Sequence, residues 1–85
     1  MYKPVYSKRF IKQIQKFPIK EQTKILDKIS SVLSNPRKFA IKMEATSPSI
    51  YRLRVGEYRV FFELDDEQKI MQTTDVKRRT TQTYR

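Results

Sequence analysis

The sequence predicts an α+β fold, in which an N-terminal strand and a helical hairpin pack on a mostly antiparallel sheet of about four strands. Apolar residues recur at helical spacing between residues 8 and 33, and they alternate with polar residues between residues 51 and 64. Turn-forming residues separate these segments. We therefore expect one domain, residues 1–85, with the order strand, two helices and three strands.

Two helices are predicted in the first half of the chain. Ser7 is a suitable N-cap for a helix from Lys8 to about Phe17. Pro18 suits the first turn of a second helix, residues 18–34, which Asn35-Pro36 ends. The predicted apolar stripe of this second helix consists of Ile19, Ile25, Leu26, Ile29, Val32 and Leu33.

The predicted strands are short. Residues 3–7, KPVYS, form an extended segment that Pro4 places at a sheet edge or a strand start. Residues 37–50 have no clear period, but residues 51–64 form a hairpin around Gly56-Glu57, a pair that suits a two-residue turn. A third segment, KIMQTTDV, follows the turn at residues 65–68, and KRRTTQTYR closes the chain.

The hairpin register separates two sets of side chains. A two-residue turn pairs Val55 with Tyr58 and places Arg54 opposite Arg59. Because side chains alternate along a strand, one face is the core, and it carries Tyr51, Leu53, Val55, Tyr58, Val60, Phe62 and Leu64. The other face carries Arg52, Arg54, Arg59, Phe61 and Glu63.

The second face points to an anionic ligand. Like charges directly opposite each other on a sheet destabilise it, by up to ~1 kcal/mol. A polar face that merely prevents aggregation is the alternative, but such a face usually mixes signs. Here Glu63 alone offsets three arginines. The spacing therefore favours a polyanion-binding site over a solvated face.

Composition narrows the classes of function. The net charge is +10, from 19 Lys and Arg against 9 Asp and Glu, which attracts nucleic acid, an acidic protein or an anionic membrane surface. The chain has no Cys and no His, so we expect no disulfide, no metal, no cofactor and no histidine base. No apolar run reaches the roughly 18 residues of a membrane span, and no signal peptide is visible. We expect a cytoplasmic protein without a membrane partner.

Two further basic features have alternative interpretations. The C-terminal residues Lys77, Arg78, Arg79, Tyr84 and Arg85 are either a disordered arm or an extension of the arginine face. A lysine occurs at every fourth position from residue 8 to residue 28, which includes Lys12 and Lys16. These lysines form either a solvated helix face or an electrostatic contact with a large RNA.

The helical hairpin, followed by YRLRVGEYRVFFELDDEQKI and then DVKRRTTQTYR, resembles the RelE/ParE superfamily of toxins from toxin–antitoxin systems, most closely the RelE-type mRNA interferases. The resemblance implies a microbial RNase-like fold and ribosome-dependent, metal-free cleavage of mRNA in the A site, which inhibits translation. The mRNA 2′-OH would attack its adjacent phosphate to leave a 2′,3′-cyclic phosphate and a 5′-OH. The implied partners are a cognate antitoxin, the ribosome and mRNA, and operator DNA only through the antitoxin complex.

The resemblance also implies roles for particular residues. Its catalytic positions match Arg52, Arg54, Arg59, Arg78 and Tyr84. Arg54 and Arg59 would hold the scissile phosphate, Arg78 would lie near the leaving oxygen and Tyr84 would stack on the base. The residues expected to contact RNA without taking part in the chemistry are Lys77, Arg79, Arg85, Lys12 and Lys16.

One departure from the family leaves the general base open. The best-known RelE-type pattern has lysines on the first hairpin strand, and a lysine can lose its proton where an arginine cannot. Glu63 or Glu57 would be a substitute, or the chemistry would rest on electrostatics and alignment alone. Two other functions compete: inhibition of DNA gyrase, as in ParE-type relatives, and non-catalytic binding of RNA or antitoxin.

Overall fold

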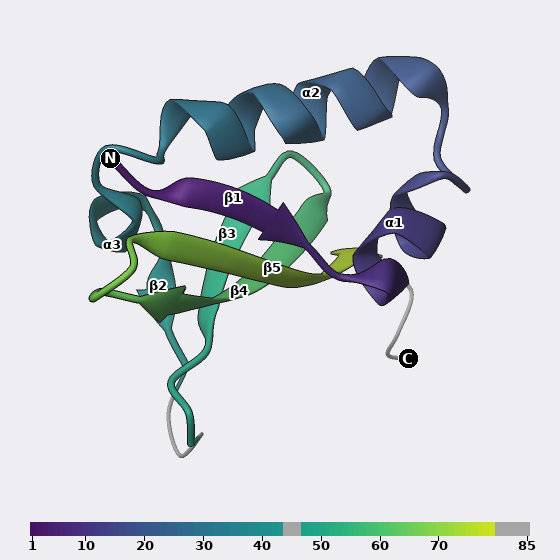
Figure 1. The fold of residues 1–85 in the computed structure, drawn as a ribbon. Helices are drawn as coiled ribbons and strands as arrows, with labels where there is room; N and C mark the ends of the chain where they lie inside the picture. Colours follow the sequence, from purple (N-terminus) through teal and green to yellow (C-terminus); the bar gives the residue numbers. More distant parts are fainter. Residues whose placement is uncertain (44–46, 80–85) are drawn as a thin grey trace, which may run out of the picture.

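The structure of the protein, a computed structural model, describes residues 1–43 and 47–79. In chain order its elements are β1 (Lys3–Tyr6), α1 (Lys8–Ile14), α2 (Ile19–Ser31), α3 (Pro36–Phe39), β2 (Ile41–Lys42), β3 (Tyr51–Val55), β4 (Tyr58–Asp65) and β5 (Ile70–Arg78). The α2 helix runs along one face of the sheet, with α1 beside it at one end (Figure 1). The predicted α+β class is therefore confirmed.

The sheet has one strand more than the sequence predicted. Its order is β1-β5-β4-β3-β2, with β1 parallel to β5 and the other neighbours antiparallel. The added strand is β2, which lies in the segment without a clear period, and it is too short to show any alternation. The edge position predicted for β1 is confirmed, as is the hairpin register, in which Arg54 faces Arg59. Gly56 has the positive φ, 60°, that a primed turn needs.

The first helix begins as predicted and ends earlier. The Phe10 amide donates to the Ser7 hydroxyl at 3.0 Å, which confirms Ser7 as the N-cap. The helix ends at Ile14 rather than near Phe17, and the Phe17 amide instead donates to the Ile14 carbonyl in a tighter turn. Pro18 disfavours helical backbone at the residue before it. Phe17 packs against Tyr58, with ring centroids 4.7 Å apart.

The second helix is also shorter than predicted, and two residues of its expected stripe are exposed. It ends at Ser31, since Val32 already leaves helical backbone angles. Ile25 and Ile29 are fully buried, but Ile19 is 73% and Leu26 is 37% exposed. Each residue turns a helix by about 100°, so Leu26 points well away from the face that Ile25 buries.

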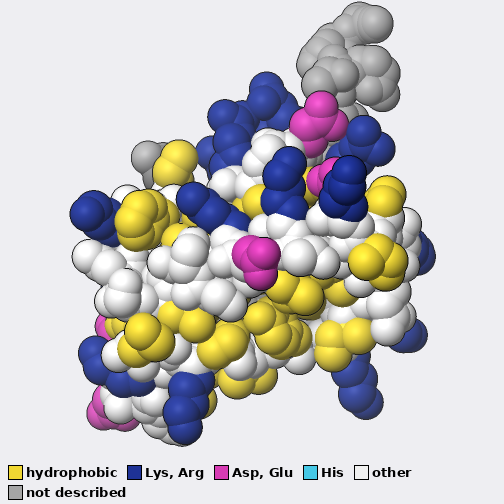
Figure 2. All heavy atoms as spheres, turned by 90° about the horizontal axis from the view of Figure 1, so that it is seen from above, with side chains coloured by type: hydrophobic (Ala, Val, Ile, Leu, Met, Phe, Trp, Pro, Cys, Tyr) yellow, Lys and Arg dark blue, Asp and Glu magenta, His cyan; other side chains and the backbone are white. Residues whose placement is uncertain are grey.

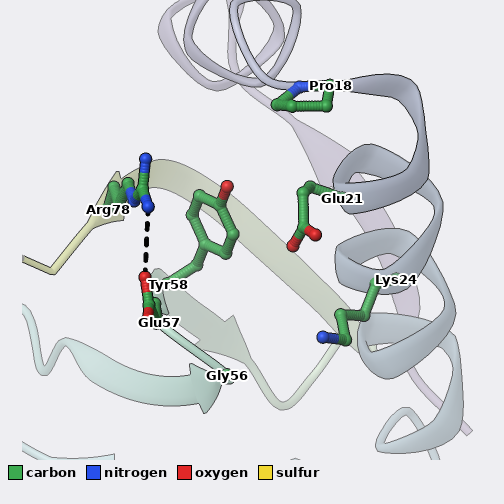
Figure 3. A pocket seen from close by; sticks show the side chains of 7 residues that line it. All are labelled: Pro18, Glu21, Lys24, Gly56, Glu57, Tyr58 and Arg78. Carbon is green, nitrogen blue, oxygen red and sulfur yellow. Dashed lines mark hydrogen bonds and ion pairs between the residues drawn. The ribbon is translucent and has the colours of Figure 1, made fainter.

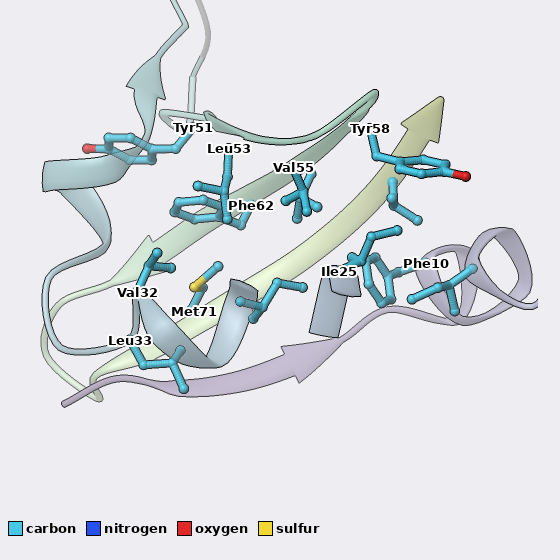
Figure 4. Packing of buried hydrophobic residues seen from close by; sticks show 14 of the residues in the cluster. Phe10, Ile25, Val32, Leu33, Tyr51, Leu53, Val55, Tyr58, Phe62 and Met71 are labelled. Atoms are coloured by element: carbon cyan, nitrogen blue, oxygen red, sulfur yellow. The ribbon is translucent and has the colours of Figure 1, made fainter. Parts of the chain in front are cut away.

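The core lies between α1 and α2 on one side and the sheet on the other (Figure 4). The sheet contributes the side chains that the hairpin register assigned to the core face, with Leu64 only partly buried at the strand end. Tyr51 stacks on Phe62, with ring centroids 5.5 Å apart. The helices therefore occupy one sheet face, and the arginine side chains project from the opposite face.

A β-bulge interrupts the pairing of β4 with β5. Phe61 pairs with Asp75 and Phe62 pairs with Thr73, so Thr74 is an extra residue. Ser7, the N-cap of α1, provides hydrogen bonds to two carbonyls of the bulge. Its amide donates to the Thr73 carbonyl at 2.9 Å, and its hydroxyl donates to the Thr74 carbonyl at 2.7 Å. The bulge is thus held in place by the junction of β1 and α1.

Candidate nucleic-acid interface

The basic face combines cations from three neighbouring strands. Arg52 and Arg54 lie on β3, and Arg59 lies on β4 directly opposite Arg54. On its other side Arg59 pairs with Lys77 of β5. Directly opposite residues have Cβ atoms about 5 Å apart, so four cationic side chains share one small area of the sheet.

Part of this surface is hollowed into a pocket, which we call the arginine pocket. Its volume is about 140 Å³, and its lining consists of Phe39, Ile41, Arg52, Arg54 and Arg59. Over residues 1–43 and 47–79, none of these three arginines has a carboxylate partner in an ion pair. Their charges are therefore available to an anionic ligand.

The bulge decides which basic residue of β5 joins this face. Met71 and Thr73 point into the core, and simple alternation from them would place Arg78 on the outer face. The extra residue Thr74 reverses the alternation, so Val76 is buried and Lys77 is the outward residue. The expectation that Arg78 shares a face with Arg59 is therefore wrong, and Lys77 occupies that place.

Arg78 instead lines a separate pocket on the helix side of the sheet (Figure 3). It pairs across the strands with Tyr58 and forms an ion pair with Glu57 at 3.2 Å. This second pocket has a volume of about 380 Å³ and lies between the N-terminal part of α2 and the hairpin turn, where Lys24 approaches Gly56. The two side chains therefore leave opposite faces of the sheet, Arg59 from the outer face and Arg78 from the helix side.

The remaining predicted site residues are placed in different ways. Lys12 and Lys16 are exposed on α1 and just beyond it, and Arg79 is exposed after β5, with its amide donating to the Glu57 carbonyl. The predicted residues Tyr84 and Arg85 lie outside the part of the chain that the structure describes. The fourfold lysine spacing does not continue as one face, since residues 15–18 separate the two helices.

Neither candidate for the general base reaches the arginine pocket. Glu63 lies four residues from Arg59 along β4, roughly 13 Å at the usual strand rise, and lines another hollow. Glu57 is at the hairpin turn with Arg78. In the described ranges, the pocket lining offers guanidinium and apolar groups only.

Sequence reasoning missed Phe39 and Ile41. Both come from the segment without a readable period, and they reach the pocket through a short helix and a two-residue strand. The only available signal was the hydrophobic character of FAI at residues 39–41, which also fits a buried segment. Their exposed fractions of 47% and 62% emerge only from the tertiary arrangement.

The described residues provide neither a metal cluster nor a membrane-spanning helix. There, no cluster of three or more metal-ligating side chains occurs. Among those same residues, no helix combines the length and hydropathy needed to cross a bilayer.

Solved structures share this architecture. The archaeal RelE from the RelE–RelB complex of Pyrococcus horikoshii OT3 is 28% identical, with 92% of this chain and 94% of that chain covered and a TM-score of 0.76. The isolated E. coli RelE toxin is 20% identical, with 98% and 89% covered and a TM-score of 0.81. The RelBE2 complex of Mycobacterium tuberculosis gives a TM-score of 0.84 at 16% identity, with 92% and 98% covered. The fold is therefore that of the RelE toxins.

The family follows from the sequence comparison. The family model described as "ParE toxin of type II toxin-antitoxin system, parDE" matches residues 5–82. This chain belongs to that family, within the RelE/ParE superfamily of type II toxins. Among curated proteins, none matches the sequence.

Proposed function

We propose that this toxin is a ribosome-dependent, metal-independent mRNA endonuclease that cleaves mRNA in the A site. The observation that supports it best is the arginine pocket, where three arginines without carboxylate partners in the described residues converge. A surface that only keeps a sheet soluble has no reason to place Arg54 opposite Arg59. A phosphodiester would relieve this repulsion by binding between them.

The arginines would stabilise the negative charge that develops on the phosphate during the reaction. The mRNA 2′-oxygen attacks the adjacent phosphorus and releases its proton to water. The bond from phosphorus to the 5′-oxygen breaks, and that oxygen keeps the electron pair and takes up a proton. Arg54 and Arg59 would bind the non-bridging oxygens, whose negative charge grows during attack, and Arg52 would hold the strand beside them. The products are a 2′,3′-cyclic phosphate and a 5′-OH.

The leaving oxygen is assigned to Lys77 in place of Arg78. Lys77 is the direct neighbour of Arg59 on the outer face, whereas Arg78 is on the other side of the sheet. An ammonium group both stabilises the departing oxygen and carries a proton to give it. The stacking of Tyr84 on the base at the cut stays a prediction from the resemblance.

Because the described part of the arginine pocket contains no carboxylate, we assign no general base. Rate enhancement would come from charge stabilisation and from holding the 2′-oxygen in line with the scissile bond. The ribosome would supply most of this alignment. This accounts for a toxin that cleaves mRNA only when the ribosome presents it.

We also propose an acidic antitoxin partner, since four of the similar structures contain a toxin together with its antitoxin or an antitoxin peptide. The view onto α2 shows apolar side chains exposed among Lys and Arg side chains (Figure 2). Val5, Ile11, Ile19 and Leu26, from β1, α1 and α2, are exposed. An antitoxin segment with apolar and acidic residues suits such a surface, and operator DNA would be contacted only through that complex.

The test is a reconstituted translation reaction with a defined mRNA stalled on the ribosome, with cuts mapped by primer extension. Arg59→Ala is expected to abolish A-site cuts while the circular dichroism spectrum stays that of the wild type and the melting temperature does not fall, since the repulsion with Arg54 is removed. Lys3→Ala removes one exposed positive charge from β1 and serves as the matched control, with cuts unchanged. Intact mRNA with folded wild-type toxin would contradict the proposal.

DNA gyrase inhibition is the second candidate, because the matching family model is that of ParE toxins. The absence of a base from the described lining of the arginine pocket also fits it. A supercoiling assay with gyrase separates the two candidates. Inhibition of supercoiling together with intact mRNA would establish the ParE-type function.

A further inference from the structure

We propose that Phe39 and Ile41 form a nucleobase subsite beside the arginine pocket, on which one base of the bound RNA stacks. This inference rests on the proposed RNA-binding function of the same face. It adds a contact with a base to the proposed contacts with phosphates. The arginines would bind the phosphates, and the apolar wall would bind the base of a neighbouring nucleotide. Tyr84, which is predicted to act at the base of the cut, is a different group.

The first observation is the exposure of an aromatic ring among cations. Phe39 ends α3, is 47% exposed and lines the pocket with the three arginines. The ammonium groups of Lys28 and Lys38 lie 5.7 and 5.6 Å from the centre of its ring. A single accessible ring surrounded by positive charge matches a nucleotide, which has an aromatic base next to a phosphate.

The second observation is the placement of Ile41. It pairs with Arg52 across β2 and β3, so both side chains project from the same sheet face. It is 62% exposed on an edge strand, a position where folding favours charged residues that prevent edge pairing. The packing of the protein therefore leaves this side chain unexplained, whereas contact with a base edge accounts for it.

The third observation is that hydrogen bonds tie α3 to the sheet. Arg37, two residues before Phe39, donates to both carboxylate oxygens of Asp66 at 3.0 and 2.9 Å and to the Tyr51 hydroxyl at 3.0 Å. Its guanidinium also lies 5.4 Å from the centre of the Tyr51 ring. These contacts hold α3 beside β3, so the backbone that carries Phe39 is already in position when a base binds.

The size of the pocket selects the occupant. Its volume of about 140 Å³ is well below the roughly 300 Å³ of pockets that enclose a whole small molecule. One planar ring fits, with its sugar and phosphates outside on the arginines. A peptide of acidic residues alone would satisfy the arginines through its carboxylates and would leave the Phe39 ring without a partner, whereas a nucleotide engages both.

The chain contains no tryptophan, which allows a direct test. Phe39→Trp introduces a single tryptophan at the subsite, which can be excited selectively over the tyrosines, and Ile19→Trp places one on the exposed side of α2 as the control. Each variant is titrated with a short single-stranded ribo-oligonucleotide, with an abasic oligonucleotide of the same length, and with an oligoglutamate peptide. We expect the ribo-oligonucleotide to quench the tryptophan of Phe39→Trp and to leave that of Ile19→Trp unchanged.

A second measurement covers the case in which tryptophan disturbs the fold. Fluorescence anisotropy of a labelled ribo-oligonucleotide gives the affinity of the wild type, Phe39→Ala and Phe39→Tyr. Phe39→Ala removes one base stack, so we expect it to bind the ribo-oligonucleotide between about 5-fold and about 150-fold more weakly than the wild type. Phe39→Tyr keeps an aromatic ring and should bind with the affinity of the wild type. The abasic oligonucleotide should bind Phe39→Ala and the wild type equally.

The proposal is overturned if the ribo-oligonucleotide binds without quenching, does not bind, or binds Phe39→Ala as tightly as the wild type. Equal quenching by the abasic oligonucleotide would reduce the site to phosphate binding, and quenching by oligoglutamate alone would assign the face to an acidic protein. Cleavage is measured separately. Quenching without cleavage would contradict the proposed nuclease activity and support the nucleobase subsite. Cleavage without quenching would support the nuclease activity and contradict the subsite.

Discussion

At the residue scale, the structure contains two energetically unfavourable features, a pair of facing arginines and a buried hydroxyl that is unpaired in the described residues, which differ in their access to solvent. Arg54 and Arg59 repel each other on an open face, where a ligand can neutralise them. The hydroxyl of Thr73 is fully buried and has no hydrogen-bond partner within the described residues. No ligand can reach it there, so the two features have different consequences for substitution.

Thr73→Val is expected to stabilise the protein by about 1 kcal/mol, because it removes an unsatisfied buried hydroxyl and keeps the branched shape. Urea denaturation followed by circular dichroism measures the change. Thr74→Val is the control: the Thr74 hydroxyl donates to the Phe61 carbonyl at 3.3 Å, so this variant should not gain stability. A loss of stability in Thr73→Val would show that the hydroxyl has a partner.

The Asp66 carboxylate predicts a pH dependence of stability. Hydrogen bonds from Arg37, and then from Tyr2, lower the pKa of Asp66 below its ordinary value of 3.8. Because the pKa is lower in the folded state, its contribution to stability is complete above about pH 4 and is lost as the pH falls through the folded-state value.

Asp66→Asn should therefore lower the free energy of unfolding at neutral pH, with the difference from wild type shrinking as the pH falls below about 4 and through the folded-state pKa. Denaturation midpoints across this range test it. Asp27→Asn, at an exposed carboxylate on α2, should show a much smaller pH-dependent difference. A difference between Asp66→Asn and wild type that is independent of pH would contradict this assignment.

At the element scale, the bulge in β5 is the feature with the largest effect on the candidate site. It places Lys77 rather than Arg78 beside Arg59, and α1 holds it through Ser7 and Gln13. The Val76 amide donates to the Gln13 side-chain carbonyl at 2.7 Å. A helix residue thereby satisfies a strand amide next to the bulge.

Gln13→Ala is expected to destabilise the protein by about 1–3 kcal/mol, since it leaves the Val76 amide without an acceptor. Hydrogen exchange at Val76 should accelerate more than exchange at the centre of β4. Gln15→Ala changes an exposed residue at the end of the same helix and should have little effect. Equal exchange rates in the wild type and Gln13→Ala would show that the bulge is stable without the Gln13 hydrogen bond.

At the scale of the whole molecule, the net charge of +10 and the clustered arginines affect RNA binding differently. The net charge raises the rate of encounter with any polyanion, whereas local contacts with phosphates release counterions. The two effects can be separated by the salt dependence of affinity.

Plots of log affinity for single-stranded RNA against log salt concentration should have a slope that is smaller by about 0.7 in Arg54→Ala and in Arg59→Ala than in the wild type. Anisotropy titrations over a range of salt concentrations give these slopes. Lys3→Ala removes the same charge at a distant edge strand and should leave the slope unchanged. Equal slopes in all four proteins would mean that the arginine face does not contact phosphate.

The amino-acid sequence determined the fold class, the N-cap of α1 and the hairpin register. Each of these depends on local chemistry, namely the capping hydroxyl of Ser7, the alternation along β3 and β4, and Gly56 in the turn. The gathering of Arg52, Arg54 and Arg59 on one face followed from that register alone. The resemblance of the chain to the RelE/ParE superfamily could be read from the same hairpin residues.

The tertiary structure decided what local patterns do not encode. The bulge at Thr74 depends on groups that lie more than 60 residues away in the chain, so the facing of Lys77 and Arg78 could not be read from alternation. Phe39 and Ile41 become a pocket wall only because Arg37 ties α3 to Asp66 and because β2 pairs with β3. Long-range contacts, rather than local periodicity, thus decide that Lys77, Phe39 and Ile41 join the three arginines.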